Sequence, residues 1–285
     1  MVMRDPYLGS VRAMPNLTSL PLELTREIIN YLPIPSLLSF GLTSKDNHAI
    51  QAVSLSTLQL GVFHSHLSGM ISFLESSSGR SSIHSVPVTL ARNESRTKEQ
   101  VIRHQNNTVR SVLDRYRHTL RDLELVMWNL TEATSVSLAG LRNLRRLSLR
   151  FDHPYTRHRD LDKSFWDTSP GSTVWNNLAA LRGKGTSFGR LESLNLERSG
   201  ITDYQLQQIL QNNPRLTELR LQKCLSVTEE TFEYLGGSAV GERLEVLHVT
   251  KTDSNEIDER VLKHIAKLRK LKVSLQKKKL SSTGR

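Results

Sequence analysis

The sequence repeats one short leucine pattern, LxxLxL or its valine variant LxxLxV, from residue 120 to residue 273. The six copies begin at Leu120, Leu144, Leu191, Leu216, Leu244 and Leu268. Successive starts differ by 24, 47, 25, 28 and 24 residues, so four of the five intervals are typical of a structural repeat of roughly 20 to 29 residues. A unit this short cannot bury its apolar side alone, and neighbouring units therefore have to stack.

Each copy predicts a short strand followed by a helix. The leucines of the pattern point into one core when such strands stack in parallel, and the chain then returns along the outside. After the strand at Leu191, Thr202 or Asp203 is placed to cap a helix, and Pro214 ends it. Thr228 is placed to begin the helix of the next unit. The sequence thus predicts an α/β repeat with one parallel sheet.

The unit LTELRLQKCLSVTEETFEYL, with Cys224 at its turn, resembles the cysteine-type leucine-rich repeats. That resemblance implies a leucine-rich-repeat solenoid over residues 120–275, with parallel strands on the concave face. The interval of 47 is then one long repeat with an inserted loop at residues 152–172. The turn position of Cys224 holds other residues elsewhere, so we expect an irregular ladder of buried side chains; these residues are Trp128, Asp152, Ser199 and Thr252.

Residues 17–50 carry a second pattern, made of short apolar helices. Pro21 and Glu23 suit a helix start, and Pro33 and Pro35 separate this helix from another that begins at Ser36. Leucines and isoleucines recur at helical spacing in both. Because about forty residues bury too little surface to be comfortably stable, we expect some of these side chains to meet a partner. The alternative is that they form the plain core of a helix bundle.

The order LPxELxxxIIxYLPxxxLLxxxxxSK in this segment resembles the F-box, the module that docks on the Skp-type adaptor of cullin ubiquitin ligases. We place an all-α F-box helix cluster at residues 15–60. Asn47 and His48 stand where the family often has a tryptophan, which either weakens the adaptor contact or marks a divergent F-box. The resemblance implies seven adaptor-binding residues: Leu20, Pro21, Leu24, Ile28, Leu32, Leu37 and Leu38.

Residues 61–119 are expected to form a helical junction and an N-terminal cap for the repeats. Apolar residues between 55 and 74 suggest helical packing, residues 75–85 are a serine-rich loop, and a helix from Thr97 through Tyr116 leads into the first repeat strand.

The formal net charge of +11 is concentrated at the C-terminal end. Residues 260–285 hold ten Lys and Arg residues and no Asp or Glu, which leaves +1 for residues 1–259. We expect residues 276–285 to be a basic tail, either a solvated segment or an import signal. The lone Cys224, the absence of an apolar run of about 20 residues and the absence of a secretory signal favour a cytoplasmic or nuclear protein without a membrane partner.

No catalytic residue, cofactor site or metal site is predicted. The string GKGTSFG at residues 183–189 leads into a strand, whereas a phosphate-binding loop opens a helix. The predicted function is the substrate-recognition subunit of an SCF-type ubiquitin ligase, whose partners are the Skp-type adaptor, the cullin ligase core and a protein substrate. The alternative is a leucine-rich-repeat scaffold that binds protein, or RNA through its basic end, with no ubiquitin role; otherwise nucleic acid is not expected as a partner.

Substrate is expected at strand positions that point away from the core and at the inserted loop, where exposed aromatic side chains favour contact. Across these strand positions the charge is expected to run from acidic to basic. The predicted substrate-binding residues are Arg146, Tyr155, Trp166, Arg220, His248, Lys270 and Lys272.

Overall fold

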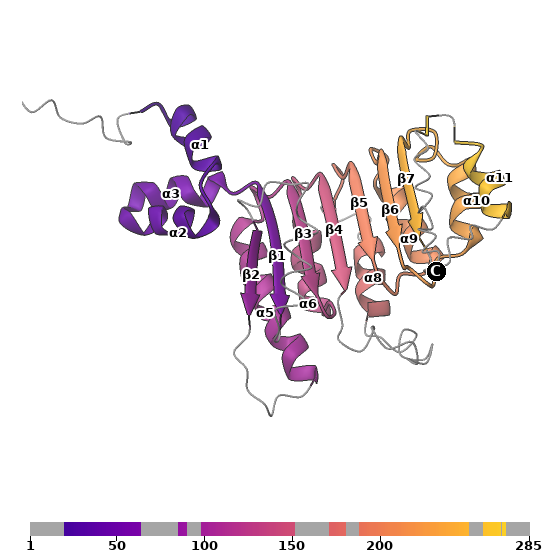
Figure 1. Ribbon diagram of the computed structural model, residues 1–285, viewed down its shortest axis with the longest axis horizontal. Coiled ribbons are helices and arrows are strands. Elements are labelled where there is room, and N and C mark those ends of the chain that lie inside the picture. Colours follow the sequence, from indigo (N-terminus) through magenta and orange to yellow (C-terminus); the bar gives the residue numbers. More distant parts are fainter. Residues whose placement is uncertain are drawn as a thin grey trace, which may run out of the picture. The chain divides into compact units, whose positions relative to one another are not determined.

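The computed structural model describes residues 20–63, 85–89, 98–151, 171–180, 188–250, 259–268 and 270–271. The chain divides into two compact units, residues 1–54 and residues 55–285. Figure 1 shows helices alone in the described part of the first unit, and strands alternating with helices in the second. No helix in these ranges is long and apolar enough to cross a membrane.

The first unit contains α1 (Leu22–Asn30), α2 (Ile34–Thr43) and α3 (Lys45–Ser54). Pro21 and Pro33 precede the first two helices, where a missing N–H costs nothing. The backbone N–H of Asn47 donates to Ser44 Oγ over 3.1 Å, which begins α3. The expected helix start at Pro21 is confirmed, whereas α2 begins at Ile34, two residues before the predicted Ser36, because the first turn of a helix accommodates proline.

The core of the first unit lies between its helices. Ile29 and Leu37 are buried, and so is the polar Gln51. A Cβ atom placed on Gly41 of α2 would lie 3.1 Å from the Cβ of Gln51 on α3. The small residue at position 41 therefore lets α2 and α3 pack closely.

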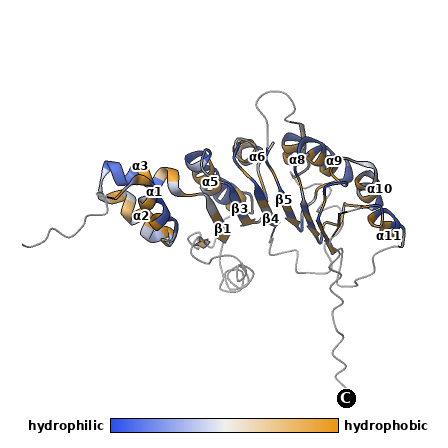
Figure 2. Cartoon of the chain, turned by 90° about the horizontal axis from the view of Figure 1, so that it is seen from above, coloured by the Kyte–Doolittle hydropathy of each residue, from blue (hydrophilic) through white to orange (hydrophobic). Residues whose placement is uncertain are grey.

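The second unit is built on one parallel sheet of seven strands in the order β2-β1-β3-β4-β5-β6-β7. These strands are β1 (Thr57–Phe63), β2 (Ser85–Thr89), β3 (Asp122–Met127), β4 (Arg146–Phe151), β5 (Ser193–Glu197), β6 (Glu218–Gln222) and β7 (Val246–Thr250). The described helices are α5 (Lys98–Tyr116), α6 (Glu132–Ala139), α8 (Gly171–Ala180), α9 (Asp203–Asn212), α10 (Glu229–Gly237) and α11 (Glu259–Ile265). Figure 2 shows these helices along one side of the sheet, so the predicted α/β repeat is confirmed.

The repeat leucines share one register across the sheet. One row of neighbours contains Leu123, Leu147, Leu194 and Leu219, and a second contains Leu125, Leu149, Leu196 and Leu221. All eight side chains are buried. Five of the six leucine motifs thus form strands. In the sixth, residues 269, 272 and 273 lie outside the described residues, the other three form no strand, and the first of them, Leu268, is buried.

The expectation of helix across residues 55–74 is wrong for β1. Leu58, Leu60 and Val62 alternate along this strand and are buried, while β1 pairs with β2 and β3. Period-two alternation was present in the sequence, but Leu58 and Val62 also fit helical spacing. The predicted helix through Tyr116 is confirmed as α5.

Residues 152–170 of the predicted inserted loop lie outside the described residues, and so does the whole of the predicted basic tail, residues 276–285. Residues 171–172, assigned to the loop from the sequence, instead form the start of α8.

Candidate protein-interaction surfaces

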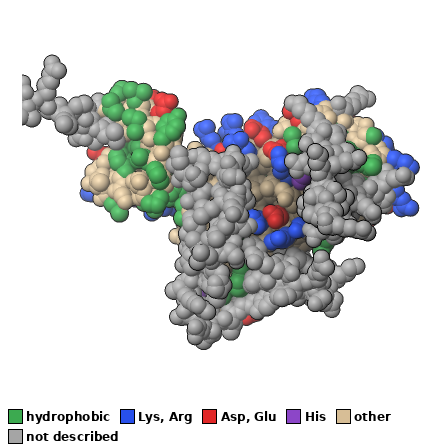
Figure 3. All heavy atoms as spheres, viewed as in Figure 1, with side chains coloured by type: hydrophobic (Ala, Val, Ile, Leu, Met, Phe, Trp, Pro, Cys, Tyr) green, Lys and Arg blue, Asp and Glu red, His purple; other side chains and the backbone are tan. Residues whose placement is uncertain are grey.

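Exposed apolar side chains gather on the first unit. Among the described residues, eleven large hydrophobic side chains are 42% or more exposed; six of them lie in the three N-terminal helices and a seventh, Tyr31, directly follows α1. Figure 3 shows hydrophobic atoms spread over the surface of these helices. The seven are Leu22, Leu24, Ile28, Tyr31, Leu38, Leu42 and Val53.

One face of α1 packs into the core of the first unit, and another face carries exposed apolar side chains. Thr25 and Ile29 face the core, while Leu24, Ile28 and Tyr31 follow each other at i, i+4 and i+7 on the outside. We call the last three the outward stripe. The same division holds on α2, where Ile34, Leu37 and Gly41 are buried and Leu38 and Leu42 are exposed. An apolar stripe that the unit's own core does not cover suits contact with another protein.

The predicted adaptor-binding residues differ in their exposure to solvent. Pro21, Leu24, Ile28 and Leu38 are exposed, and Leu20 and Leu32 are half-buried. Leu37 is only 2% exposed, so it supports the helices from within. Sequence reasoning did not single out Tyr31 and Leu42, which are 71% and 85% exposed. Their helical spacing from Ile28 and Leu38 was the available signal.

Comparison with protein families places an F-box domain at residues 17–50, the segment that contains α1, α2 and the outward stripe. The chain therefore carries an F-box, as its sequence indicated. A search of curated proteins found no match. F-box adaptor proteins typically have no catalytic activity of their own, and an F-box implies a partner of the Skp-type adaptor class. Within the described ranges, no group of three or more His, Cys, Asp or Glu side chains could hold a metal ion.

The sheet face away from the helices carries rows of paired polar side chains. Arg146 on β4 makes two hydrogen bonds to Asp122 on β3, Nε to Oδ1 at 2.6 Å and Nη2 to Oδ2 at 2.7 Å. The hydrogen bond to Asp122 raises the pKa of Arg146 above its usual value. In the next row Gln59 donates to Glu124 over 3.1 Å.

Similar pairs continue along the sheet. Arg150 and Glu197 are 3.5 Å apart across β4 and β5, and Arg220 lies 2.5 Å from Glu218 on the same strand. Acidic and basic side chains therefore lie next to each other over β3 to β6. The expected change from acidic to basic stays a prediction, because its basic end includes Lys272, which lies outside the described residues.

Arg146, Arg220 and His248 share this face, as predicted from the strand positions. His248 on β7 pairs in register with Arg220 on β6. Burial, followed by the charge of Arg220, lowers the pKa of His248. Lys270 is exposed and follows α11, while Tyr155, Trp166 and Lys272 lie outside the described residues.

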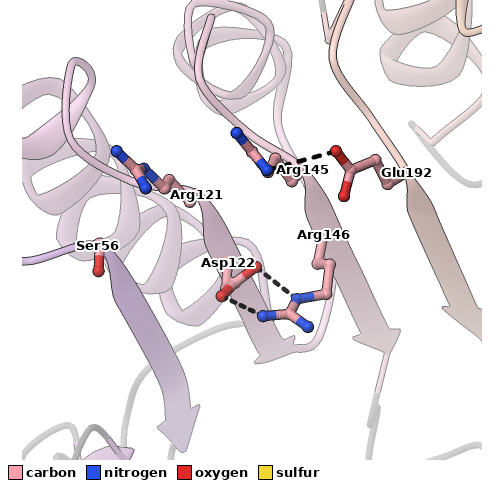
Figure 4. Close-up of a pocket in the computed structure, with 6 residues that line it drawn as sticks. All are labelled: Ser56, Arg121, Asp122, Arg145, Arg146 and Glu192. Atoms are coloured by element: carbon pink, nitrogen blue, oxygen red, sulfur yellow. Dashed lines mark hydrogen bonds and ion pairs between the residues drawn. The ribbon is translucent and has the colours of Figure 1, made fainter. Parts of the chain in front are cut away.

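An open depression of about 350 Å³ lies where β3, β4 and β5 begin (Figure 4). Its lining is mainly charged, and Arg146 is the one lining residue that was among the predicted substrate-binding residues. The lining residues are Ser56, Arg121, Asp122, Arg145, Arg146 and Glu192.

Proposed function

We propose that this chain is the substrate-recognition subunit of an SCF-type ubiquitin ligase. The observation that carries the proposal is the outward stripe, because Leu24, Ile28 and Tyr31 are exposed on the segment that matches the F-box. Association with the Skp-type adaptor would cover this apolar surface, and the adaptor would link the chain to the cullin ligase core. This assembly is expected in the cytoplasm or nucleus.

We further propose that the second unit is a leucine-rich-repeat body that binds the substrate protein. Support comes from the shared register of the leucines and from four of the five motif intervals, which are 24 to 28 residues long. Cys224 supports the same assignment, since its buried Sγ lies 3.1 Å from Ser199 Oγ, the turn residue of the preceding unit. In this proposal the repeats span residues 120–275, β1, β2 and α5 form the N-terminal cap, and the polar sheet face contacts substrate.

Affinity capture of the full chain tests this function. The tagged chain should retain the Skp-type adaptor and cullin from a cell extract, and proteasome inhibition should increase the recovery of substrate. Ile28→Lys should abolish adaptor capture, because burying an unpaired lysine in an apolar contact costs several kcal/mol. The matched control is Val136→Lys, which places the same charge at an exposed valine on α6. Failure of the unaltered chain to retain the adaptor would favour a scaffold with no ubiquitin role.

A further inference from the structure

We propose that the depression at the starts of β3, β4 and β5 binds an acidic segment of a partner protein, with Arg121 and Arg145 contacting its carboxylates. This inference rests on the proposed role of the second unit in substrate binding, and it specifies the chemical class of the segment bound.

Arg121 and Arg145 occupy equivalent places, one residue before β3 and one residue before β4. The backbone N–H of Arg145 donates to the carbonyl oxygen of Arg121 over 2.7 Å, so the two residues are neighbours on adjacent strands about 4.8 Å apart. Figure 4 shows both side chains extending from this edge of the sheet in the same direction, away from the Asp122–Arg146 pair. Two guanidinium groups are thereby brought beside one depression.

The carboxylates of the depression leave positive charge available. Both carboxylate oxygens of Asp122 already accept hydrogen bonds from Arg146. Glu192 lies 3.6 Å from Arg145, and because both side chains are about half exposed this ion pair is weak. The exposed side chain of Arg121 makes no hydrogen bond or ion pair with any residue in the described part of the chain.

The surrounding sequence strengthens this positive character. Residues 115–150 contain seven Lys and Arg residues and three Asp and Glu residues, a net charge of +4, whereas residues 1–259 as a whole carry +1. Figure 3 shows Lys and Arg atoms along the edge where the strands begin, with Asp and Glu atoms among them. The planar guanidinium group binds carboxylates through two parallel hydrogen bonds, so this pair of arginines suits Asp or Glu side chains.

A protein segment fits the edge better than a nucleic acid does. Nucleic acid binding requires cations that follow successive phosphates. Along the same row of backbone positions, Glu192 precedes β5, Thr217 precedes β6 and Glu245 precedes β7. These carboxylates would repel a continuing phosphate backbone, whereas a short acidic segment would occupy only the arginine end.

The test measures binding of a fluorescent Glu-rich peptide to the full chain at 0.15 M salt. Arg121→Gln combined with Arg145→Gln should weaken binding about tenfold. The matched control combines Arg215→Gln with Arg243→Gln, which removes the same charge from exposed residues before β6 and β7 and should leave the affinity unchanged. A photoreactive version of the peptide should cross-link to residues near the start of β3 or β4, which separates this site from the basic residues 260–285.

Equal weakening in both double variants, equal binding of a Gln-rich peptide, or cross-links confined to residues 260–285 would overturn the inference. So would a single-stranded RNA oligonucleotide that binds more tightly than the peptide and is lost in the Arg121/Arg145 variant alone. Adaptor capture is measured on the same preparations. Loss of peptide binding with adaptor capture retained counts against this site only, whereas missing adaptor capture counts against the proposed ligase role.

Discussion

Asp203, the first residue of α9, accepts hydrogen bonds from both the backbone and the side chain of Thr228, which precedes α10 in the next repeat unit. Thr228 N donates to Oδ1 over 2.9 Å, and Thr228 Oγ1 donates to Oδ2 over 2.8 Å. Thr231 adds a bond of 2.5 Å to Oδ1. Asn106 of α5 holds Thr131 before α6 in the same way, through Thr131 N to Asn106 Oδ1 at 2.8 Å. A buried polar side chain of one helix thus fixes the start of the next.

This relationship makes Asp203 a stability determinant. We expect Asp203→Ala to lower the free energy of unfolding by about 3 kcal/mol, because it leaves the buried hydroxyl of Thr231, together with the N–H and hydroxyl of Thr228, without their acceptor. Urea unfolding of the full chain measures the change. Asp114→Ala is the control, since the ion pair of Asp114 with Arg110 and its hydrogen bond from Ser137 Oγ are exposed to solvent and their loss should cost only about 1 kcal/mol. Equal costs for the two variants would show that Asp203 has no special role.

Cys224 should react with a thiol reagent only after unfolding. Its side chain is buried, and burial raises the pKa of the thiol, so the reactive thiolate is scarce in the folded chain. Ellman's reagent at pH 8 should label the native chain very slowly and should label one thiol per chain in concentrated urea. Rapid labelling of the native chain would contradict the packed position of Cys224 between Ser199 and the carbonyl of Leu196.

His248 should make the second unit less stable in mild acid. Burial and Arg220 lower the pKa of His248, so the unfolded chain takes up a proton near the usual value of about 6.5 while the folded chain takes it up only at lower pH. The stabilising contribution is therefore complete above about pH 6.5 and is lost as the pH falls through the folded-state pKa. In His248→Gln, urea midpoints between pH 7.5 and pH 5 should fall less steeply than in the unaltered chain. An unchanged slope would contradict the lowered pKa.

Local patterns predicted the parts of the fold that depend on spacing along the chain. The leucine motifs of β3 to β7 repeat at intervals of 24 to 28 residues except for the interval of 47 between β4 and β5, and this spacing was sufficient to predict a parallel sheet. Thr202 and Thr228 were recognised as helix starts for the same reason. By contrast, the string LSTLQL that leads into β1 begins at Leu55, 65 residues before the copy at Leu120 and outside the regular interval, and Leu58 and Val62 also fitted helical spacing. The sequence alone therefore did not decide between strand and helix there.

Contacts between units could not be predicted in this way. Asp203 was considered as a cap for its own helix, but Thr202 has that role and Asp203 bonds to a residue 25 positions later. In the F-box, Leu24, Ile28 and Ile29 formed one apolar stripe in the sequence. Which of them faces inward depends on the packing of α1 within the helix cluster, which spacing along a single helix does not determine.

The central claim is that the outward stripe of α1 binds the Skp-type adaptor, and adjacent isoleucines provide its most direct test. Ile28 is 43% exposed and Ile29 is 0% exposed, so Ile28→Ala and Ile29→Ala remove the same atoms from opposite environments. Titration calorimetry with a purified Skp-type adaptor and urea unfolding are measured on both variants. We expect Ile28→Ala to weaken adaptor binding about tenfold with unchanged unfolding. Ile29→Ala should destabilise the F-box by about 2–5 kcal/mol. Undiminished adaptor affinity in a folded Ile28→Ala chain would contradict the claim.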